Sequence, residues 1–101
     1  MSCGACFLEE LERVIEERLR GASPEESYTA RIAAKGIGYA ARKLGEEAVE
    51  TIVEALRGDK EALKREAADL VYHLLVLLHM EGLSLRDVVE VLEERARWRR
   101  E

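Results

Sequence analysis

Apolar residues recur at helical spacing along the whole chain, without the alternating pattern typical of β-strands. Gly21 ends a first amphipathic helix, whose apolar positions are Phe7, Leu8, Leu11, Val14, Ile15 and Leu19. The segment SPEE predicts a second helix start, with Ser23 as N-cap, Pro24 in the first position and Glu26 completing a capping box. The segment SYTARIAAKG then predicts a short turn and a helix that ends at Gly36.

Three further helices follow, each with start or stop signals of its own. One runs from about residue 38 to residue 57, and a glycine ends it. The next covers residues 59–80 and begins at Asp59, whose carboxylate is a good N-cap. Ser84 caps the last helix, and Asp87 completes its capping box. The short, glycine-marked connections between these helices predict an antiparallel all-α helical bundle.

The helix over 59–80 is apolar around its whole circumference, so it must be covered on every side. The chain has 101 residues, which we expect to form one domain over 1–101, and this leaves too few other helices to provide the cover. We therefore predict that the bundle assembles as a helical homodimer or a larger oligomer. On the preceding helix we expect a buried stripe spaced i, i+3, i+4 and i+7, formed by Val49, Ile52, Val53 and Leu56.

Composition narrows the classes of function. The chain is 48% hydrophobic and 37% charged, which favours a folded protein, and its net charge of −5 argues against general nucleic-acid binding. The N-terminus lacks the basic and apolar regions of a signal peptide. The most apolar stretch, Ala67 to Met80, is too short to span a bilayer and carries Asp69. We therefore expect a cytoplasmic protein without a membrane partner.

Cys3 and Cys6 form the motif CGAC near the N-terminus. Their spacing fits half of a zinc ribbon or a redox pair. The chain supplies no second pair of zinc ligands, and no strand precedes the motif as it does in a thioredoxin-like site. The pattern therefore favours incidental or mildly redox-active thiols over a dedicated site.

Three glutamates, Glu46, Glu47 and Glu50, share one face of their helix beside the apolar stripe. By itself this pattern indicates an acidic face in water. The following helix changes that interpretation, because Glu66 and Asp69 lie three residues apart on a helix with almost no polar side. A carboxylate there must be paired, hydrogen-bonded or bound to a metal, since an unpaired buried charge is very costly.

Carboxylates brought together by two antiparallel helices repel one another unless a cation neutralises them. An all-carboxylate set favours a hard divalent ion, Mg²⁺ or Mn²⁺, over zinc. A di-iron bundle is the rival interpretation, but it expects Glu-x-x-His pairs, and Asp69 stands where that histidine would be. Magnesium held by a few carboxylates is typical of phosphate substrates. Basic residues that precede the acidic group fit either phosphate binding or ordinary surface charge: Arg31, Lys35, Arg42 and Lys43.

Four segments of the chain, SYTARIAAKG, RKLGEEAVETI, EAADLVYHLLVLL and GLSLRDVVEVLEER, together resemble the phosphoribosyl-ATP pyrophosphatase family. That family belongs to the all-α, MazG-like nucleotide pyrophosphatases, and the resemblance runs from about Phe7 to Arg95. The superfamily pattern Glu-Glu-x-x-Glu followed by Glu-x-x-Asp is carried by Glu46, Glu47, Glu50, Glu66 and Asp69.

The resemblance implies a nucleotide-binding, dimeric enzyme that hydrolyses phosphoribosyl-ATP to phosphoribosyl-AMP and pyrophosphate with Mg²⁺, the second step of histidine biosynthesis. It implies that Glu46 is either a further ligand or the catalytic carboxylate that positions the attacking water. The metal ligands that it implies are Glu47, Glu50, Glu66 and Asp69. The residues that it implies near the phosphates and ribose are Ser27, Tyr28, Thr29, Lys35 and Lys43.

The chain departs from the family at one turn, where the family usually carries an acidic and a basic residue after AAKG. Here Ile37, Gly38 and Tyr39 occupy those positions, so one basic contact is missing. Two alternative functions remain at this stage. One is a MazG-like pyrophosphatase that acts on other nucleoside triphosphates. The other is a non-catalytic helical dimerisation module whose acidic face provides solubility.

Overall fold

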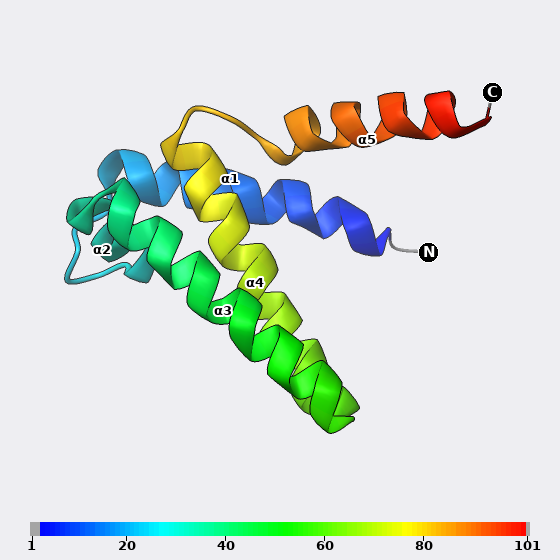
Figure 1. Cartoon of the computed structure of the whole chain (residues 1–101). Helices are drawn as coiled ribbons and strands as arrows, with labels where there is room; N and C mark the ends of the chain where they lie inside the picture. The colour runs from blue at the N-terminus through cyan, green and yellow to red at the C-terminus, as the bar shows by residue number, and fades with distance from the viewer. Residues whose placement is uncertain (1–2, 101) are drawn as a thin grey trace.

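The computed structural model describes residues 3–100, with side chains as far as residue 97. These residues contain a short 3₁₀ turn, five α-helices and no β-strand, which confirms the predicted all-α class (Figure 1). The helices are α1 (Phe7–Gly21), α2 (Tyr28–Lys35), α3 (Ile37–Arg57), α4 (Lys60–Met80) and α5 (Leu85–Arg100), and the turn is Gly4–Cys6.

The helices α3 and α4 form a long antiparallel hairpin, and they pack against each other along most of their length (Figure 1). The helix α1 crosses α4 near the end of the hairpin that carries the start of α3, and α2 fills the corner between α1 and α3. The helix α5 leaves the C-terminal end of α4 and extends away from the hairpin. The hairpin is therefore covered by other helices at one end only.

The core lies where α1, α2 and α3 meet the C-terminal half of α4. Its buried side chains come from all four helices and are Ile15, Ile32, Ala40, Leu75 and Val76. The stripe on α3 that the sequence predicted to be buried is exposed in the single chain, so that prediction is wrong for the isolated chain. Val49 is 59% exposed and Leu56 is 84% exposed, because no helix of the described chain covers this side of the hairpin.

The predicted helix at SPEE is also wrong. Residues 24–26 form a single turn, in which the Ser23 hydroxyl donates to a Glu26 carboxylate oxygen at 2.8 Å. Helical backbone cannot continue from there, because Ser27 is extended, with φ −139° and ψ 126°. Ser27 instead caps α2, and its hydroxyl oxygen accepts from the Ala30 amide at 3.2 Å.

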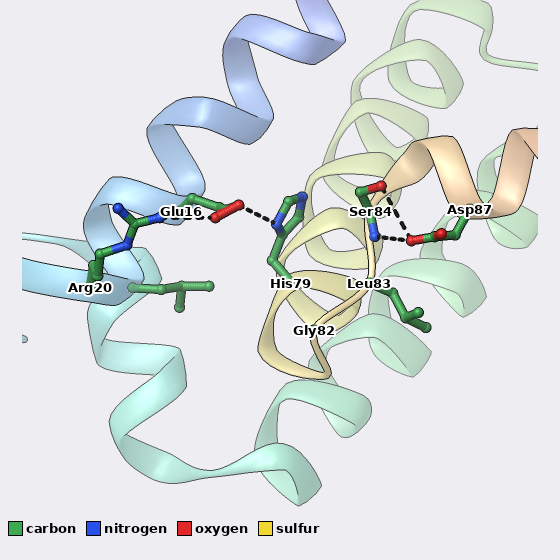
Figure 2. A pocket seen from close by; sticks show the side chains of 8 residues that line it. Glu16, Arg20, His79, Gly82, Leu83, Ser84 and Asp87 are labelled. Atoms are coloured by element: carbon green, nitrogen blue, oxygen red, sulfur yellow. Dashed lines mark hydrogen bonds and ion pairs between the residues drawn. The ribbon is translucent and has the colours of Figure 1, made fainter.

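The predicted cap at Asp59 is confirmed, because its carboxylate accepts from the Ala62 amide at 3.0 Å. At the last helix the Asp87 half of the predicted capping box is present, since the Ser84 amide donates to the Asp87 carboxylate at 2.8 Å (Figure 2). Glu12 of α1 fixes the corner between α4 and α5, because its Oε1 atom accepts from both His79 Nε2 at 2.7 Å and the Leu85 amide at 2.8 Å.

Figure 2 shows this corner, where His79 also points toward Glu16, whose Oε2 atom lies 3.7 Å from His79 Nδ1. The two cysteines of the CGAC motif, Cys3 and Cys6, are joined in a disulfide beside the start of α1. No single helix in residues 3–100 is long and apolar enough to cross a membrane; α4 and α5 reach that length and composition only as a pair bent by 105°.

Candidate metal and substrate site

Three carboxylates meet at the hairpin, Glu47 from α3 and Glu66 and Asp69 from α4. One oxygen atom from each lies within 4.8 Å of the others. The antiparallel packing of α3 on α4 brings the two helices together here, and the i, i+3 spacing puts Glu66 and Asp69 on the same face of α4. We refer to these three residues as the acidic cluster.

The structure corrects one step of the sequence argument. Asp69 is exposed rather than buried, because the polar side of α4 at this level is not covered by another helix of the chain. Glu47 is half-buried, and its Oε2 atom is inaccessible to solvent and has no hydrogen-bond partner among the described residues. The carboxylate that needs a neutralising partner is therefore Glu47 on α3 and not, as predicted, Asp69 on α4.

The environment of Glu47 disfavours its charged form. Burial, followed by the negative charges of Glu50 and Asp69, raises the pKa of the Glu47 carboxyl to about 7. A buried oxygen without a donor, set among other carboxylates, is suited to a cation. Because every donor is a carboxylate oxygen, the cluster fits a hard divalent ion such as Mg²⁺ or Mn²⁺ and not a thiol- or imidazole-bound metal.

The two remaining predicted carboxylates are not among these three. Glu50 is exposed, but it lies close enough to Glu47 for its charge and a side-chain hydrogen bond to raise the pKa of Glu47. Glu46 faces the basic residues of α3, since its carboxylate lies 3.3 Å from Lys43 Nζ and 3.9 Å from Arg42 Nε. The hydrogen bond to Glu46 is the main reason that the pKa of Lys43 is raised.

The predicted substrate residues at the start of α2 divide into structural and accessible groups. Ser27 and Thr29 are buried, and Thr29 Oγ1 contacts the Tyr72 hydroxyl on α4. Tyr28 is 38% exposed, and its hydroxyl lies 2.9 Å from His73 Nε2. The sequence analysis assigned no role to Tyr72 and His73, although both lie one helical turn after Asp69 on α4.

Positively charged side chains lie at the corner between α2 and α3, where the sequence departs from the pattern of the family that it resembles. The Tyr39 ring carries Lys35 Nζ at 4.7 Å from its centroid and Arg42 Cζ at 5.4 Å. A cation over an aromatic face is attracted to the ring quadrupole, so Tyr39 holds both cations near one another. Arg31 lies similarly over Tyr28, at 5.7 Å from the ring centroid. The α2–α3 corner is therefore basic and aromatic, beside an acidic hairpin.

The helices and the acidic cluster together define an all-α protein with three carboxylates that could hold a hard divalent cation. A family profile described as phosphoribosyl-ATP pyrophosphohydrolase matches residues 8–96, which is most of the chain. The chain belongs to this family, and the resemblance read from its four segments is confirmed.

Two similar proteins are named phosphoribosyl-ATP pyrophosphatase, and the match covers nearly their whole length; a third is a longer, bifunctional protein. The chain is 58% identical over 95 residues to a phosphoribosyl-ATP pyrophosphatase of Pyrobaculum arsenaticum, covering 94% of this chain and 98% of that protein. A phosphoribosyl-ATP pyrophosphatase of Metallosphaera sedula is 57% identical over 88 residues, which cover 87% and 94%. The histidine biosynthesis bifunctional protein HisIE of Photobacterium profundum is 53% identical over 89 residues, covering 88% of this chain and 42% of that protein.

The raised pKa of Glu47 predicts an unusual pH dependence of stability. Its carboxyl has a pKa of about 7 when folded and near 4.5 when unfolded, so the metal-free wild type loses stability as pH rises through this window. The variant Glu47→Gln has no such proton to release. In the presence of chelator, the melting temperature of Glu47→Gln minus that of the wild type should increase between pH 4.5 and about 7 and stay constant at higher pH.

Glu61→Gln is the matched control, because Glu61 is an exposed carboxylate on α4 outside the acidic cluster. It should follow the wild type at every pH. Added Mg²⁺ should raise the melting temperature of the wild type and of this control, but not of Glu47→Gln, because a ligand that binds only the folded state stabilises it. The same pH dependence in all three proteins would contradict the assignment.

Proposed function

We propose that the chain is a phosphoribosyl-ATP pyrophosphatase that works with Mg²⁺, or Mn²⁺, held by the acidic cluster. The reaction is hydrolysis of phosphoribosyl-ATP to phosphoribosyl-AMP and pyrophosphate, in histidine biosynthesis. The observation that carries the proposal is the buried Glu47 oxygen, which has no donor among the described residues, in a chain that belongs to the phosphoribosyl-ATP pyrophosphohydrolase family.

Glu47, Glu66 and Asp69 hold the cation, and Glu50 is a further ligand at the edge of the cluster. When bound, the ion would offset the negative charge of the substrate phosphates and of the cluster itself. Lys43 and Lys35 attract the polyphosphate from the basic corner between α2 and α3. Lys35 and Lys43 are positively charged, whereas the acidic cluster is negatively charged. This difference orients a substrate that is anionic at its phosphates.

Glu46 is proposed as the carboxylate that positions the attacking water. Its ion pair with Lys43, at 3.3 Å, supports this role, because the carboxylate then lies beside a group that attracts phosphate. The water oxygen forms a bond to the α phosphorus. The bond from this phosphorus to the bridging oxygen breaks, and the bridging oxygen leaves with pyrophosphate. The proton of the water passes to a carboxylate, and general-base assistance of this kind typically contributes about 10²- to 10⁴-fold to the rate.

Asp69→Asn tests the metal site and the reaction class together. Pyrophosphate release from phosphoribosyl-ATP in Mg²⁺ should fall at least about 100-fold, because one charged ligand is lost. The metal-free fold should keep its melting temperature or gain slightly, because a like charge has been removed from the cluster. Glu61→Gln, on the same helix but outside the cluster, should keep full activity.

A panel of ordinary nucleoside triphosphates distinguishes the substrate. Release of pyrophosphate from the panel but not from phosphoribosyl-ATP would favour the MazG-like alternative. Loss of folding in Asp69→Asn, without any metal-dependent turnover in the wild type, would favour the non-catalytic dimerisation module instead.

A homodimer is the second part of the proposal, and the apolar stripe of α3 is its proposed interface. Val49, Ile52, Val53 and Leu56 are between 43% and 84% exposed, although their spacing puts them on one face of α3. Exposed apolar patches of this kind mark interaction sites, and covering one with a second copy removes its surface from water. This interface would bury the stripe that the single chain leaves open.

Val53→Glu tests the interface. A charge in a buried apolar contact is strongly disfavoured, so this variant should elute as a monomer at micromolar concentration while the wild type is a dimer. Val14→Glu is a matched control, because Val14 lies on α1 and is 42% exposed, close to the 43% of Val53. Light scattering coupled to size-exclusion chromatography measures both. A monomeric wild type, or two variants that behave alike, would contradict the proposed interface.

A further inference from the structure

His73 is a buried histidine that the proposed mechanism does not use. It lies on α4 one turn after Asp69 and is 6% exposed. Both of its ring nitrogen atoms are engaged, Nδ1 with the Asp69 carbonyl oxygen at 2.8 Å and Nε2 with the Tyr28 hydroxyl at 2.9 Å. One imidazole therefore connects the backbone of a proposed metal ligand to a proposed substrate residue that is 45 positions away in the chain.

The chemistry of the partners fixes the direction of the hydrogen bond at Nδ1, and in the neutral ring it also fixes the direction of the bond at Nε2. A carbonyl oxygen can only accept, so Nδ1 of His73 must carry a proton. In the neutral ring Nε2 is then an acceptor, and the Tyr28 hydroxyl must donate to it. Burial raises the pKa of Tyr28, which keeps this phenol protonated. The phenolic proton points at His73, and the lone pairs of the oxygen remain available to accept another hydrogen bond.

Aromatic packing holds the same arrangement. The rings of Tyr28 and Tyr72 are stacked, with centroids 6.2 Å apart and 20° between their planes. The His73 ring stands edge-on to both, at 5.7 Å from Tyr28 and 5.3 Å from Tyr72. Tyr72 in turn contacts the Thr29 hydroxyl, so the first turn of α2 is attached to α4 at two adjacent points. Offset and edge-on aromatic pairs of this kind favour one defined geometry.

We propose that His73 is a positioning residue for the reaction. It fixes the Tyr28 hydroxyl relative to the acidic cluster, so that the Tyr28 oxygen accepts a hydrogen bond from a hydroxyl group of the nucleotide substrate. The inference rests on the proposed function, because it requires a hydroxyl-bearing nucleotide beside the cluster. His73 itself does not touch the substrate, and its effect passes through Tyr28.

Substitutions at the two residues test this coupling. His73→Leu removes both hydrogen bonds and Tyr28→Phe removes only the hydroxyl, and each should raise KM for phosphoribosyl-ATP about 5- to 10-fold, the effect of one lost hydrogen bond. The change in kcat should be smaller. The double variant should be no worse than either single one, because both act through the same hydroxyl. His73→Gln, whose amide oxygen can still accept from Tyr28, should recover most of the loss.

His79→Gln is the matched control. His79 is also largely buried and makes a 2.7 Å hydrogen bond to Glu12, but it belongs to the corner between α1, α4 and α5. This variant should lose stability without a change in KM. If His73→Leu or Tyr28→Phe lowers only the melting temperature, or if the effects of these two substitutions on KM add, the proposal is overturned.

Nitrogen NMR of the histidine rings provides a readout that does not depend on activity. In wild-type His73 the Nδ1 atom should carry the proton and Nε2 should be the acceptor of the Tyr28 hydroxyl, and the Nε2 resonance should shift in Tyr28→Phe. The opposite tautomer would overturn the proposal. A wild type without activity on phosphoribosyl-ATP would instead overturn the proposed function, and the positioning role with it, while the NMR spectrum would still report the hydrogen bonds themselves.

Discussion

Repulsion between carboxylates across the α3–α4 hairpin is the constraint on which the site depends. Packing these two helices together forces Glu47 against Glu66 and Asp69, and leaves the Glu47 Oε2 atom buried without a donor among the described residues. Such an arrangement is costly in the absence of a counter-ion. A sequence selected for stability alone would place an apolar residue at position 47, so the cost is consistent with a site that a divalent cation completes.

The rest of the chain supports that hairpin from one end. The helices α1 and α2 cover the C-terminal half of α4 with a small core that includes Ile15 and Leu75. His73 lies at the boundary between this core and the acidic cluster, and it connects α2 to α4 through Tyr28. The other side of α3 is apolar and exposed in the single chain.

Most of the fold could be predicted because helix signals are local. Apolar periodicity and the caps at Asp59 and Ser84 depend on residues within one turn of each other, and these helix starts are confirmed. The SPEE prediction failed because Ser23 and Ser27 both resemble N-caps, and only backbone geometry decides between them. The pairing of the two helices that carry the carboxylates followed from short connections between antiparallel neighbours.

The predictions of burial that were wrong depended on which neighbouring helices cover each helix. Periodicity identified the type of each position but not which face another helix covers, so Asp69 was expected to be buried and the α3 stripe to be covered within the fold. The contact between Tyr28 and His73 joins residues far apart in the chain, and no local pattern indicates it.

Diffraction from crystals soaked in Mn²⁺ tests whether the acidic cluster binds a divalent cation, because the anomalous signal locates the ion without reference to activity. We expect a peak bounded by carboxylate oxygens of Glu47, Glu66 and Asp69, with the Glu47 Oε2 atom among the ligands. Crystals that bind no manganese at the hairpin, with that Glu47 oxygen satisfied by a proton or by another protein group, would contradict this expectation.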